Sequence, residues 1–271
     1  MKITALVENT SIVESLVPRH GLSIYVETPK HKVLFDVGPD ETFLHNAKKL
    51  GIDVAEVDTV VLSHGHKDHG GGLASFLKAN DKARIYINSK AFEPHYIKVL
   101  FAKISVGIDP ALESNSRVVF VDDNMCIDEE LFIFSDVTGQ FNTQGNRKLL
   151  KKGREGYTMD DFTHEQNLLV SAEGKVALLT GCSHRGIVNI MSRALKYDPQ
   201  INVVVGGFHL YDPSSFKTES PAVIEGVARE LEYLGPKYYT CHCTGTKAFQ
   251  LMHSILGEKV SYLGTGKSVQ F

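Results

Sequence analysis

Six consecutive residues, from His64 to His69, hold the densest group of side chains that could do chemistry. Three imidazoles and one carboxylate come from His64, His66, Asp68 and His69. Zinc, iron and manganese accept imidazole nitrogen and carboxylate oxygen as ligands. In a turn, His64 and His66 can face one metal ion while Asp68 and His69 face a second position. We therefore expect one or two divalent ions here, with zinc as the first choice and iron or manganese as alternatives.

Glycines flank these histidines and favour a tightly folded loop. Gly65 lies inside the cluster, and Gly70, Gly71 and Gly72 follow it. Glycine removes the side chain where the backbone must fold closely beneath an ion. A solvated His-rich turn and a closed structural zinc site are the plainer interpretations, but structural sites usually use four Cys or His ligands. The carboxylate of Asp68 favours an open, catalytic site.

The sequence HGHKDH resembles the HxHxDH signature of the metallo-β-lactamase superfamily. The resemblance implies an α/β fold, an αββα sandwich with two mixed β-sheets packed inside and helices outside. We expect one such domain over residues 1–271. The resemblance also implies a metal-dependent hydrolase.

Two histidines in the second half of the chain resemble the remaining ligands of this superfamily. His242 follows a predicted strand at 238–240 and should join Asp68 and His69 at the second metal position. His184 is our candidate to join His64 and His66, and His164 is the alternative.

Cys182 departs from the superfamily pattern. It stands where the bridging Asp is expected, at the end of the strand in LLTGCSH. A thiolate there could bind metal, and a small buried cysteine would be equally ordinary. The sequence leaves these two roles open.

Four segments in order, HGHKDHGGG, TGCSHRGIVNI, GGFHL and CHCTG, resemble a narrower subfamily. These are the metal-dependent hydrolases similar to 7,8-dihydropterin-6-methyl-4-(β-D-ribofuranosyl)aminobenzene-5′-phosphate synthase. The resemblance implies a small substrate, phosphorylated or pterin-like, hydrolysed by metal-activated water. A transferase or synthase that joins a dihydropterin to an aminobenzene-ribosyl phosphate is the alternative. Iron-dependent redox chemistry ranks third, because the second motif ligand is His66 rather than Glu.

Further side chains could assist the chemistry. Asp68 could orient the attacking water, and His209, at a predicted strand tip, could act as acid or base. Thr244, Gly245, Thr246 and Lys247 open a predicted helix whose free N–H groups could hold an anion, although simple helix capping would explain them too. We expect Cys241 and Cys243 to pack, pointing away from whatever His242 faces.

The pattern of apolar residues predicts alternating strands and helices in both halves. We expect helices near residues 43–50, 73–77, 187–194, 221–234 and 246–255. Residues 93–115 are harder to assign, and Tyr96, Leu100 and Ile104 suggest a helix that could cover a site. Strands are expected at residues 3–7, 22–27, 32–36, 57–62, 84–87, 118–121, 131–135, 168–171, 175–180, 201–205, 238–240, 260–263 and 268–271.

Composition indicates an ordinary globular protein. Apolar residues make up 42% and charged residues 23% of the chain, and the formal charge is −3. No long apolar run or signal peptide is evident, so we expect a cytoplasmic protein with reduced cysteines. The acidic balance favours a small-molecule substrate over nucleic acid or a membrane. The basic stretch RKLLKKGR, from Arg147 to Arg154, is expected to be a solvated loop.

Overall fold

The computed structural model describes residues 1–141 and 144–271. The chain divides into two compact units. Unit 1 holds Met1–Asp122, Leu149–Gln166 and Gly264–Phe271, and unit 2 holds Asp123–Lys148 and Asn167–Leu263. The single domain predicted over residues 1–271 stays a prediction, because a compact unit can be half of a domain or a domain of its own.

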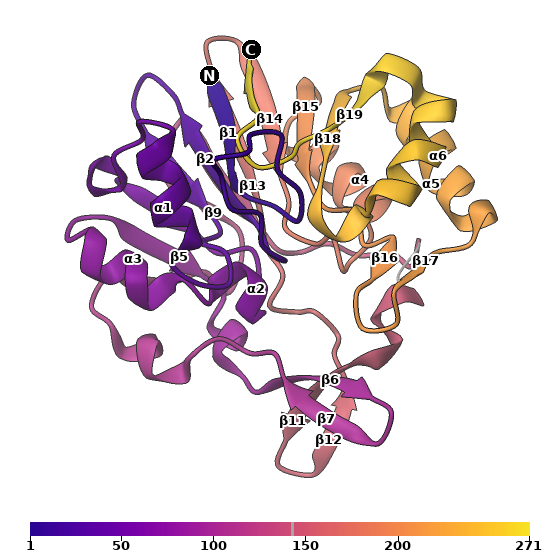
Figure 1. Cartoon of the computed structure of the whole chain (residues 1–271), viewed down its shortest axis with the longest axis horizontal. Coiled ribbons are helices and arrows are strands. Elements are labelled where there is room, and N and C mark those ends of the chain that lie inside the picture. The colour runs from indigo at the N-terminus through magenta and orange to yellow at the C-terminus, as the bar shows by residue number, and fades with distance from the viewer. Residues whose placement is uncertain (142–143) are drawn as a thin grey trace. The chain divides into compact units, whose positions relative to one another are not determined.

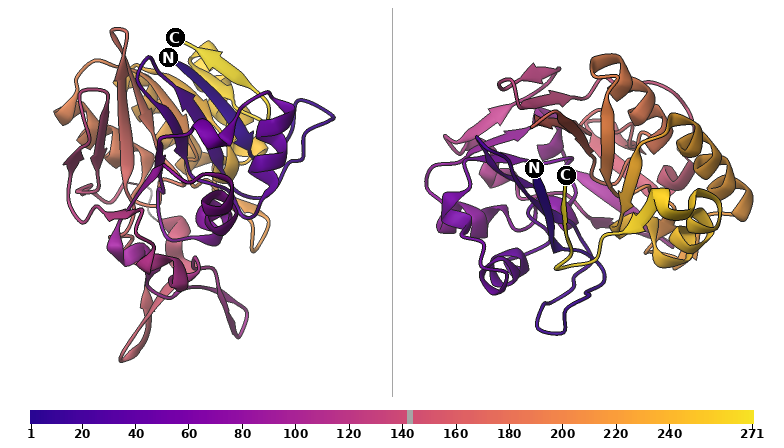
Figure 2. Two further views of the ribbon diagram at one scale, coloured as in Figure 1. Left: turned by 90° about the vertical axis from the view of Figure 1, so that its left-hand side faces the viewer. Right: turned by 90° about the horizontal axis from the view of Figure 1, so that it is seen from above.

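Unit 1 is built on a seven-stranded mixed sheet (Figure 1). From one edge the first four strands pair antiparallel, and the last four, β3, β4, β5 and β8, pair parallel. The two chain ends pair in this sheet, and Figure 2 shows them side by side. In sheet order the strands are β20 (Ser268–Gln270), β1 (Lys2–Val7), β2 (Ser23–Glu27), β3 (Lys32–Phe35), β4 (Thr59–Val61), β5 (Arg84–Ile87) and β8 (Val118–Phe120).

Two amphipathic helices cover this sheet of unit 1, α1 (Thr42–Lys49) and α3 (Leu73–Ala79). Phe43 of α1 and Phe76 of α3 are fully buried in one apolar cluster with residues from β3, β4 and β5. Burying such side chains contributes roughly 1.5 to 3 kcal/mol each. Shorter turns in unit 1 are η1 (Val54–Glu56), α2 (Lys67–Gly70), η2 (Ser89–Phe92) and η3 (Pro110–Ser114).

A four-stranded antiparallel sheet forms an arm that extends from the rest of unit 1 (Figures 1 and 2). Its strands, in sheet order, are β12 (Gly156–Met159), β11 (Leu149–Gly153), β6 (His95–Val99) and β7 (Ala102–Ser105).

The arm corrects two predictions. The helix suggested by Tyr96, Leu100 and Ile104 is wrong: Leu100 sits in the turn with a positive φ of 54°, and Ile104 pairs across the strands with Ile97. A spacing of four residues fits a helix face, but the alternation within β6 and β7 prevails. The basic stretch is wrong as a loop, because its Leu149–Gly153 part is strand β11, paired on both sides.

Unit 2 is built on a second seven-stranded mixed sheet. Strands β14, β15, β18 and β19 are parallel neighbours, while β13, β10 and β9 complete the sheet in antiparallel pairs. Its strands in sheet order are β19 (Val260–Tyr262), β18 (Lys237–Thr240), β15 (Ile201–Gly206), β14 (Lys175–Leu179), β13 (Asn167–Ala172), β10 (Leu131–Phe134) and β9 (Met125–Cys126).

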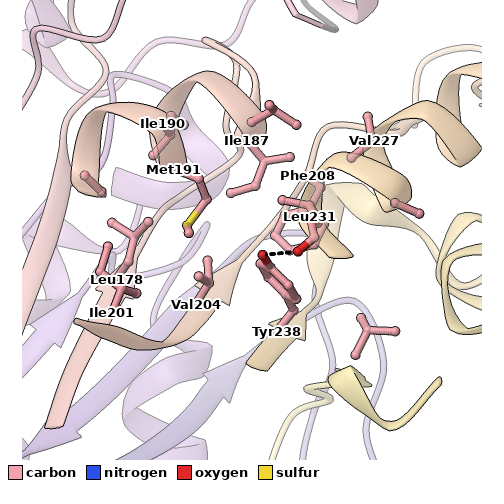
Figure 3. Close-up of a cluster of buried hydrophobic side chains, with 14 of the residues drawn as sticks. Leu178, Ile187, Ile190, Met191, Ile201, Val204, Phe208, Val227, Leu231 and Tyr238 are labelled. Atoms are coloured by element: carbon pink, nitrogen blue, oxygen red, sulfur yellow. Dashed lines mark hydrogen bonds between the residues drawn. The ribbon is translucent and has the colours of Figure 1, made fainter. Parts of the chain in front are cut away.

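Three helices pack on this sheet of unit 2, α4 (Ile187–Tyr197), α5 (Pro221–Leu234) and α6 (Thr246–Leu256). Figure 3 shows Met191 and Leu231 of two of these helices over Val204 and Tyr238 of the strands. The hydroxyl of buried Tyr238 donates to the carbonyl of Leu231, which satisfies the one polar atom of that ring. Short elements in unit 2 are η4 (Gln144–Lys148), β16 (Tyr211–Asp212), β17 (Lys217–Thr218), η5 (His242–Thr244) and η6 (Gly257–Lys259).

The predicted ends of α5 are confirmed. The Ser220 side chain accepts from the N–H of Val223, Pro221 occupies the first turn, and Gly235 ends the helix in the left-handed conformation. The predicted strands outside the arm are confirmed to within a few residues. Within residues 1–141 and 144–271, no helix has the length and apolar character needed to cross a membrane.

Candidate metal centre

Strand β4 and helix α2 position the histidine motif of unit 1. The motif follows β4 at its carboxyl end, and His66 stands directly before α2 in an extended conformation. Neighbouring backbone holds the loop on the other side: Lys67 N–H donates to the Val106 carbonyl (2.7 Å) and Ile108 N–H to the Gly65 carbonyl (3.1 Å). The segment predicted as a cover is thus attached to the motif by its own backbone. Its action as a lid stays a prediction.

The motif glycines are required by close backbone approach, as predicted. A Cβ on Gly65 would lie 2.2 Å from the carbonyl oxygen of Ala91, and one on Gly71 would lie 2.3 Å from that of Pro39. Both clashes are with backbone, which cannot swing away. The loop therefore keeps its shape only with glycine at these positions.

The motif side chains gather in one buried cluster. The ring centroids of His64 and His66 are 4.6 Å apart, and those of His64 and His69 are 4.2 Å apart. The carboxylate of Asp68, 24% exposed, lies 3.7 Å from Nε2 of His69 and 3.4 Å from Nε2 of His20. The four predicted motif ligands are therefore brought together, and one carboxylate among them reaches solvent.

A buried carboxylate, Asp36, sets the orientation of two of these rings. Asp36 accepts hydrogen bonds from the N–H and hydroxyl of Ser63, both 2.7 Å, and lies 2.6 Å from Nδ1 of His69. The Ser63 hydroxyl oxygen is also 2.8 Å from Nδ1 of His64. Because the Ser63 hydroxyl proton goes to Asp36, His64 must donate from Nδ1, as must His69. Both rings therefore keep a lone pair on Nε2, the form that binds a metal.

His66 is neutral at physiological pH. Its burial lowers its pKa from 6.5 to about 3, and the opposing effect of Asp68 is smaller. A metal ligand must be the neutral imidazole, so no proton has to be removed from this ring near pH 7.

A second buried group contacts the motif of unit 1. It consists of His95, Asp160 and His164. Oδ2 of Asp160 is 2.8 Å from Nδ1 of His95 and 3.3 Å from Nε2 of His164. Burial would raise the pKa of Asp160, but the hydrogen bonds with His164 and His95 bring it well below its usual range. Burial lowers the pKa of His164.

His164 uses both ring nitrogens inside this group. Nδ1 of His164 accepts the N–H of Gly65 at 3.1 Å, and Nε2 faces Asp160. Binding a metal would require His164 to give up one of these bonds. The geometry therefore favours a supporting role for His164 over the alternative ligand role weighed from the sequence.

In unit 2, Asn146 holds His184 by two hydrogen bonds. The Asn146 side chain donates to the His184 carbonyl (2.8 Å), and its oxygen lies 2.9 Å from Nδ1 of His184. An amide oxygen can only accept, so His184 donates from Nδ1 and keeps its lone pair on Nε2. This is the same tautomer as that of His64 and His69.

The other predicted donors of unit 2 lie around Cys182. The ligand atoms of Cys182, His184 and His209 are all within 4.8 Å of one another, and so are those of Cys182, His242 and Cys243. The ring centroids of His184 and His209 are 4.2 Å apart. Unit 2 therefore carries its own set of nitrogen and sulfur donors. That the donor sets of the two units share an ion stays a prediction.

The expectation that Cys243 points away from whatever His242 faces is wrong, because the ligand atoms of both residues lie within 4.8 Å of each other and of the sulfur of Cys182. Strand β18 ends at Thr240, and His242, with a φ of 50°, begins the turn η5, so strand alternation no longer applies. Burial would raise the pKa of the Cys243 thiol, but hydrogen bonds with Cys182 and His209 lower it well below its usual value. Cys241 is fully buried, in keeping with a packing role.

The predicted anion-binding segment is partly engaged within unit 2. The Thr244 hydroxyl oxygen accepts the N–H of Phe208 at 2.9 Å and shares a hydrogen bond with Thr240. Gly245 has a φ of 72° directly before α6, which begins at Thr246. Lys247 lines a cavity of about 780 Å³ bounded by β17, α5 and α6. Anion binding at this segment stays a prediction.

Sequence reasoning missed the residues that orient the donors. Asp36 directly follows β3 in the run Phe35-Asp36-Val37-Gly38, where a charged residue after a buried strand was an available signal. Asn146 and His95 carried no such signal, because Asn146 is 38 positions from His184 and His95 is 65 positions from Asp160.

The donor set fits a divalent metal ion. Buried imidazoles with their lone pairs on Nε2, a carboxylate and a thiol are ligands that zinc or iron accepts. In unit 1, Asp36 and Ser63 hold two of these rings in position, as outer partners of metal ligands commonly do.

Comparisons with known proteins agree with this chemistry. The family model of the metallo-beta-lactamase superfamily matches residues 16–189. The 7,8-dihydropterin-6-methyl-4-(beta-D-ribofuranosyl)-aminobenzene-5'-phosphate synthase of Methanocaldococcus jannaschii is 28% identical, over 93% of this chain and 90% of its own length.

Two solved structures share the arrangement of the elements. Tm1679, described as a metal-dependent hydrolase of the beta-lactamase superfamily, superposes with a TM-score of 0.82 at 30% identity, over 100% of this chain and 99% of its own. Zinc-bound PqqB from Methylobacterium extorquens superposes with a TM-score of 0.60 at 10% identity, over 100% of both chains. The α/β fold predicted from the HxHxDH motif is thereby confirmed.

Proposed function

Because the chain belongs to the metallo-β-lactamase superfamily and is a metal-dependent enzyme of that superfamily, we propose that it hydrolyses a small molecule through metal-activated water. The substrate we propose is phosphorylated or pterin-like, in line with the name of the M. jannaschii relative. Zinc is the proposed metal, with iron or manganese as alternatives.

The observation that supports this proposal most is the buried set of His64, His66 and His69 in unit 1. Asp36 and Ser63 fix two of these rings in the tautomer with the lone pair on Nε2, and burial keeps the third ring neutral. Three buried, neutral imidazoles on one short loop are the kind of ligand that zinc and iron accept. When bound, a divalent ion supplies Lewis acidity and a nucleophilic water at neutral pH.

Two further residues have roles that their surroundings allow. Asp68 is the partly exposed carboxylate of the cluster and can accept a proton from an attacking water or orient it. His209 is half-buried beside His184, and we assign it the proton donated to the leaving group. Both are proposed catalytic residues.

Metal-stripped and zinc-loaded protein should be compared on a panel of phosphate mono- and diesters. We expect hydrolysis by the zinc-loaded protein alone, and its loss together with bound zinc in His66→Gln. The matched control is His253→Gln, because His253 is exposed on α6. Equal hydrolysis with and without metal would contradict the proposal.

A second candidate is a synthase that joins a dihydropterin to an aminobenzene-ribosyl phosphate. The M. jannaschii relative, named as such a synthase, supports it over nearly the whole chain. The metal would then polarise an electrophile instead of activating water. Mass spectrometry of the metal-loaded protein incubated with both partners separates the candidates: a joined product supports the synthase, and cleavage products alone support the hydrolase.

A further inference from the structure

Three parallel strands of unit 2 end at the same edge of their sheet. Leu179 of β14 pairs with Val205 of β15, and Val205 pairs with Tyr239 of β18. The carboxyl ends of parallel neighbours meet, so the loops that follow are brought together. These three loops carry, in order along the chain, Cys182 with His184, then His209, then His242 with Cys243.

Cys182 is the donor common to both groups at this edge. One group joins its sulfur to His184 and His209, and the other joins it to His242 and Cys243, with all ligand atoms of a group within 4.8 Å. Ligand bonds of about 2.0 to 2.3 Å around a tetrahedral zinc place the ligand atoms roughly 3.5 Å from one another. The sulfur of Cys182 therefore needs only a small adjustment to share an ion with imidazoles from two different loops.

Cys243 is held in a different way. Its sulfur accepts the N–H of His209 at 3.3 Å and lies 3.3 Å from the carbonyl oxygen of Cys182. A Cβ on Gly207 would meet this sulfur at 2.4 Å, so glycine there leaves room for it. These contacts tie the loops after β14, β15 and β18 together, which makes Cys243 a positioning residue.

We propose that Cys182 is a thiolate ligand of a metal ion at this edge of unit 2, together with His184 from the first of these groups and His242 from the second. This inference rests on the proposed metal-dependent function and adds the identity of one ligand. On binding, the thiol proton of Cys182 leaves to the buffer and the sulfur lone pair bonds to the ion. A thiolate favours zinc or iron(II) and disfavours magnesium and calcium, so the resident metal belongs to the softer class.

Cobalt(II) alone, added to metal-stripped protein, tests the assignment, because a thiolate ligand gives a sulfur-to-cobalt charge-transfer band in the near ultraviolet. We expect this band in the wild-type chain, in Cys126→Ser and in Cys243→Ser. Cys126 is the exposed cysteine and serves as the matched control. In Cys182→Asp the cobalt should remain bound while the band disappears, because oxygen replaces sulfur.

Persistence of the band in Cys182→Asp would overturn the assignment, as would its loss in Cys243→Ser alone. Should the Cys182 variant not fold, X-ray absorption on the zinc-loaded wild type decides: we expect a sulfur neighbour at about 2.3 Å, and nitrogen and oxygen alone would contradict the proposal. Stoichiometric metal without sulfur would leave the metal-dependent function standing, whereas no metal binding at all would refute both.

Discussion

In unit 1 the donor atoms come from one loop of six residues. In unit 2 they come from three loops that together span about 60 positions of the chain. The unit 1 loop is anchored by a buried carboxylate, Asp36, through three hydrogen bonds. The unit 2 donors are anchored by a neutral amide, Asn146, and by the sulfur of Cys243. A charged side chain therefore orients the donors of unit 1. The donors of unit 2 depend on the strand ends that carry them and on contacts with uncharged groups.

The two donor sets also differ in where the backbone has positive φ values. Within unit 2, Ser183, His209 and His242 have positive φ values of 59°, 49° and 50° at or beside the donors. In the unit 1 motif the positive φ, 59°, belongs to the anchor Asp36. Such conformations cost of order 1 to 3 kcal/mol and persist only when the surroundings impose them. The strained residues of unit 2 are thus donors or their neighbours, whereas the strained residue of unit 1 is Asp36, which orients the donors.

The largest effect should follow from removing the charge of the unit 1 anchor. Asp36→Asn places an amide group opposite the N–H and hydroxyl donors that now point at a carboxylate. We expect the free energy of unfolding to fall by about 3 kcal/mol and zinc affinity to fall roughly 10- to 100-fold. Urea unfolding and competition with a chromogenic chelator measure the two quantities.

The control for this variant is Asp58→Asn in the same unit. Asp58 also accepts three hydrogen bonds, from His31, Lys32 and Thr59, but it lies away from the motif and is 38% exposed. We expect unchanged zinc affinity in Asp58→Asn. Equal losses of affinity in both variants would show that the Asp36 anchor has no particular link to the metal.

The neutral state of His66 gives the second prediction, for metal-free protein. The folded pKa of His66 is lowered to about 3, so between pH 6.5 and 3 only the unfolded chain takes up this proton. Stability must therefore fall as the solution is acidified through this range. From pH 6.5 to 5 the contribution is about 2 kcal/mol.

Urea unfolding of metal-free protein at the two pH values checks this contribution. His66→Gln should lose about 2 kcal/mol less than the wild type on acidification, since glutamine does not titrate. His253→Gln, with an exposed ring, should behave as the wild type does. An identical pH slope in wild type and His66→Gln would mean that the buried ring is already charged.

The same contrast explains what could be predicted from the sequence. The motif of unit 1 is contiguous, so spacing alone identified His64, His66, Asp68 and His69. The strands β14, β15 and β18 were also evident from their apolar runs, and their tips drew attention to Cys182, His209 and His242. Side-chain direction at those tips was not predictable, because the turn at His242 reverses the alternation on which the Cys243 prediction relied.

The anchor Asn146 and the strands of the arm could not be predicted from local sequence patterns. Asn146 contacts His184 across 38 positions, and nothing in its neighbours indicates that pairing. The arm pairs β6 with β11, more than 50 positions apart, and its short strands carry lysines that resemble a solvated loop. Contacts between residues far apart in the sequence determine the position of Asn146 and the structure of the arm, and the local sequence indicates them only weakly.

The smallest effect concerns the neutral anchor of unit 2. Asn146→Ala removes the acceptor of His184 Nδ1 and the donor to its carbonyl, both buried. We expect a loss of about 1 kcal/mol in stability and roughly 10-fold in zinc affinity, the lower end for an outer partner of a ligand. Asn124→Ala is the control, because Asn124 also makes side-chain bonds in unit 2 but to Tyr197 and Ser135.

Asn146→Asp tests whether charge matters at this position, because it gives unit 2 the kind of anchor that unit 1 has. The carboxylate still accepts from Nδ1 of His184 and makes that ring a stronger base, while the bond to the His184 carbonyl is lost. If charge is what distinguishes the anchors, zinc affinity in Asn146→Asp should equal or exceed that of the wild type. An affinity as low as that of Asn146→Ala would instead assign the anchoring to the bond with the carbonyl. Chelator competition on the three proteins, side by side, decides between these results.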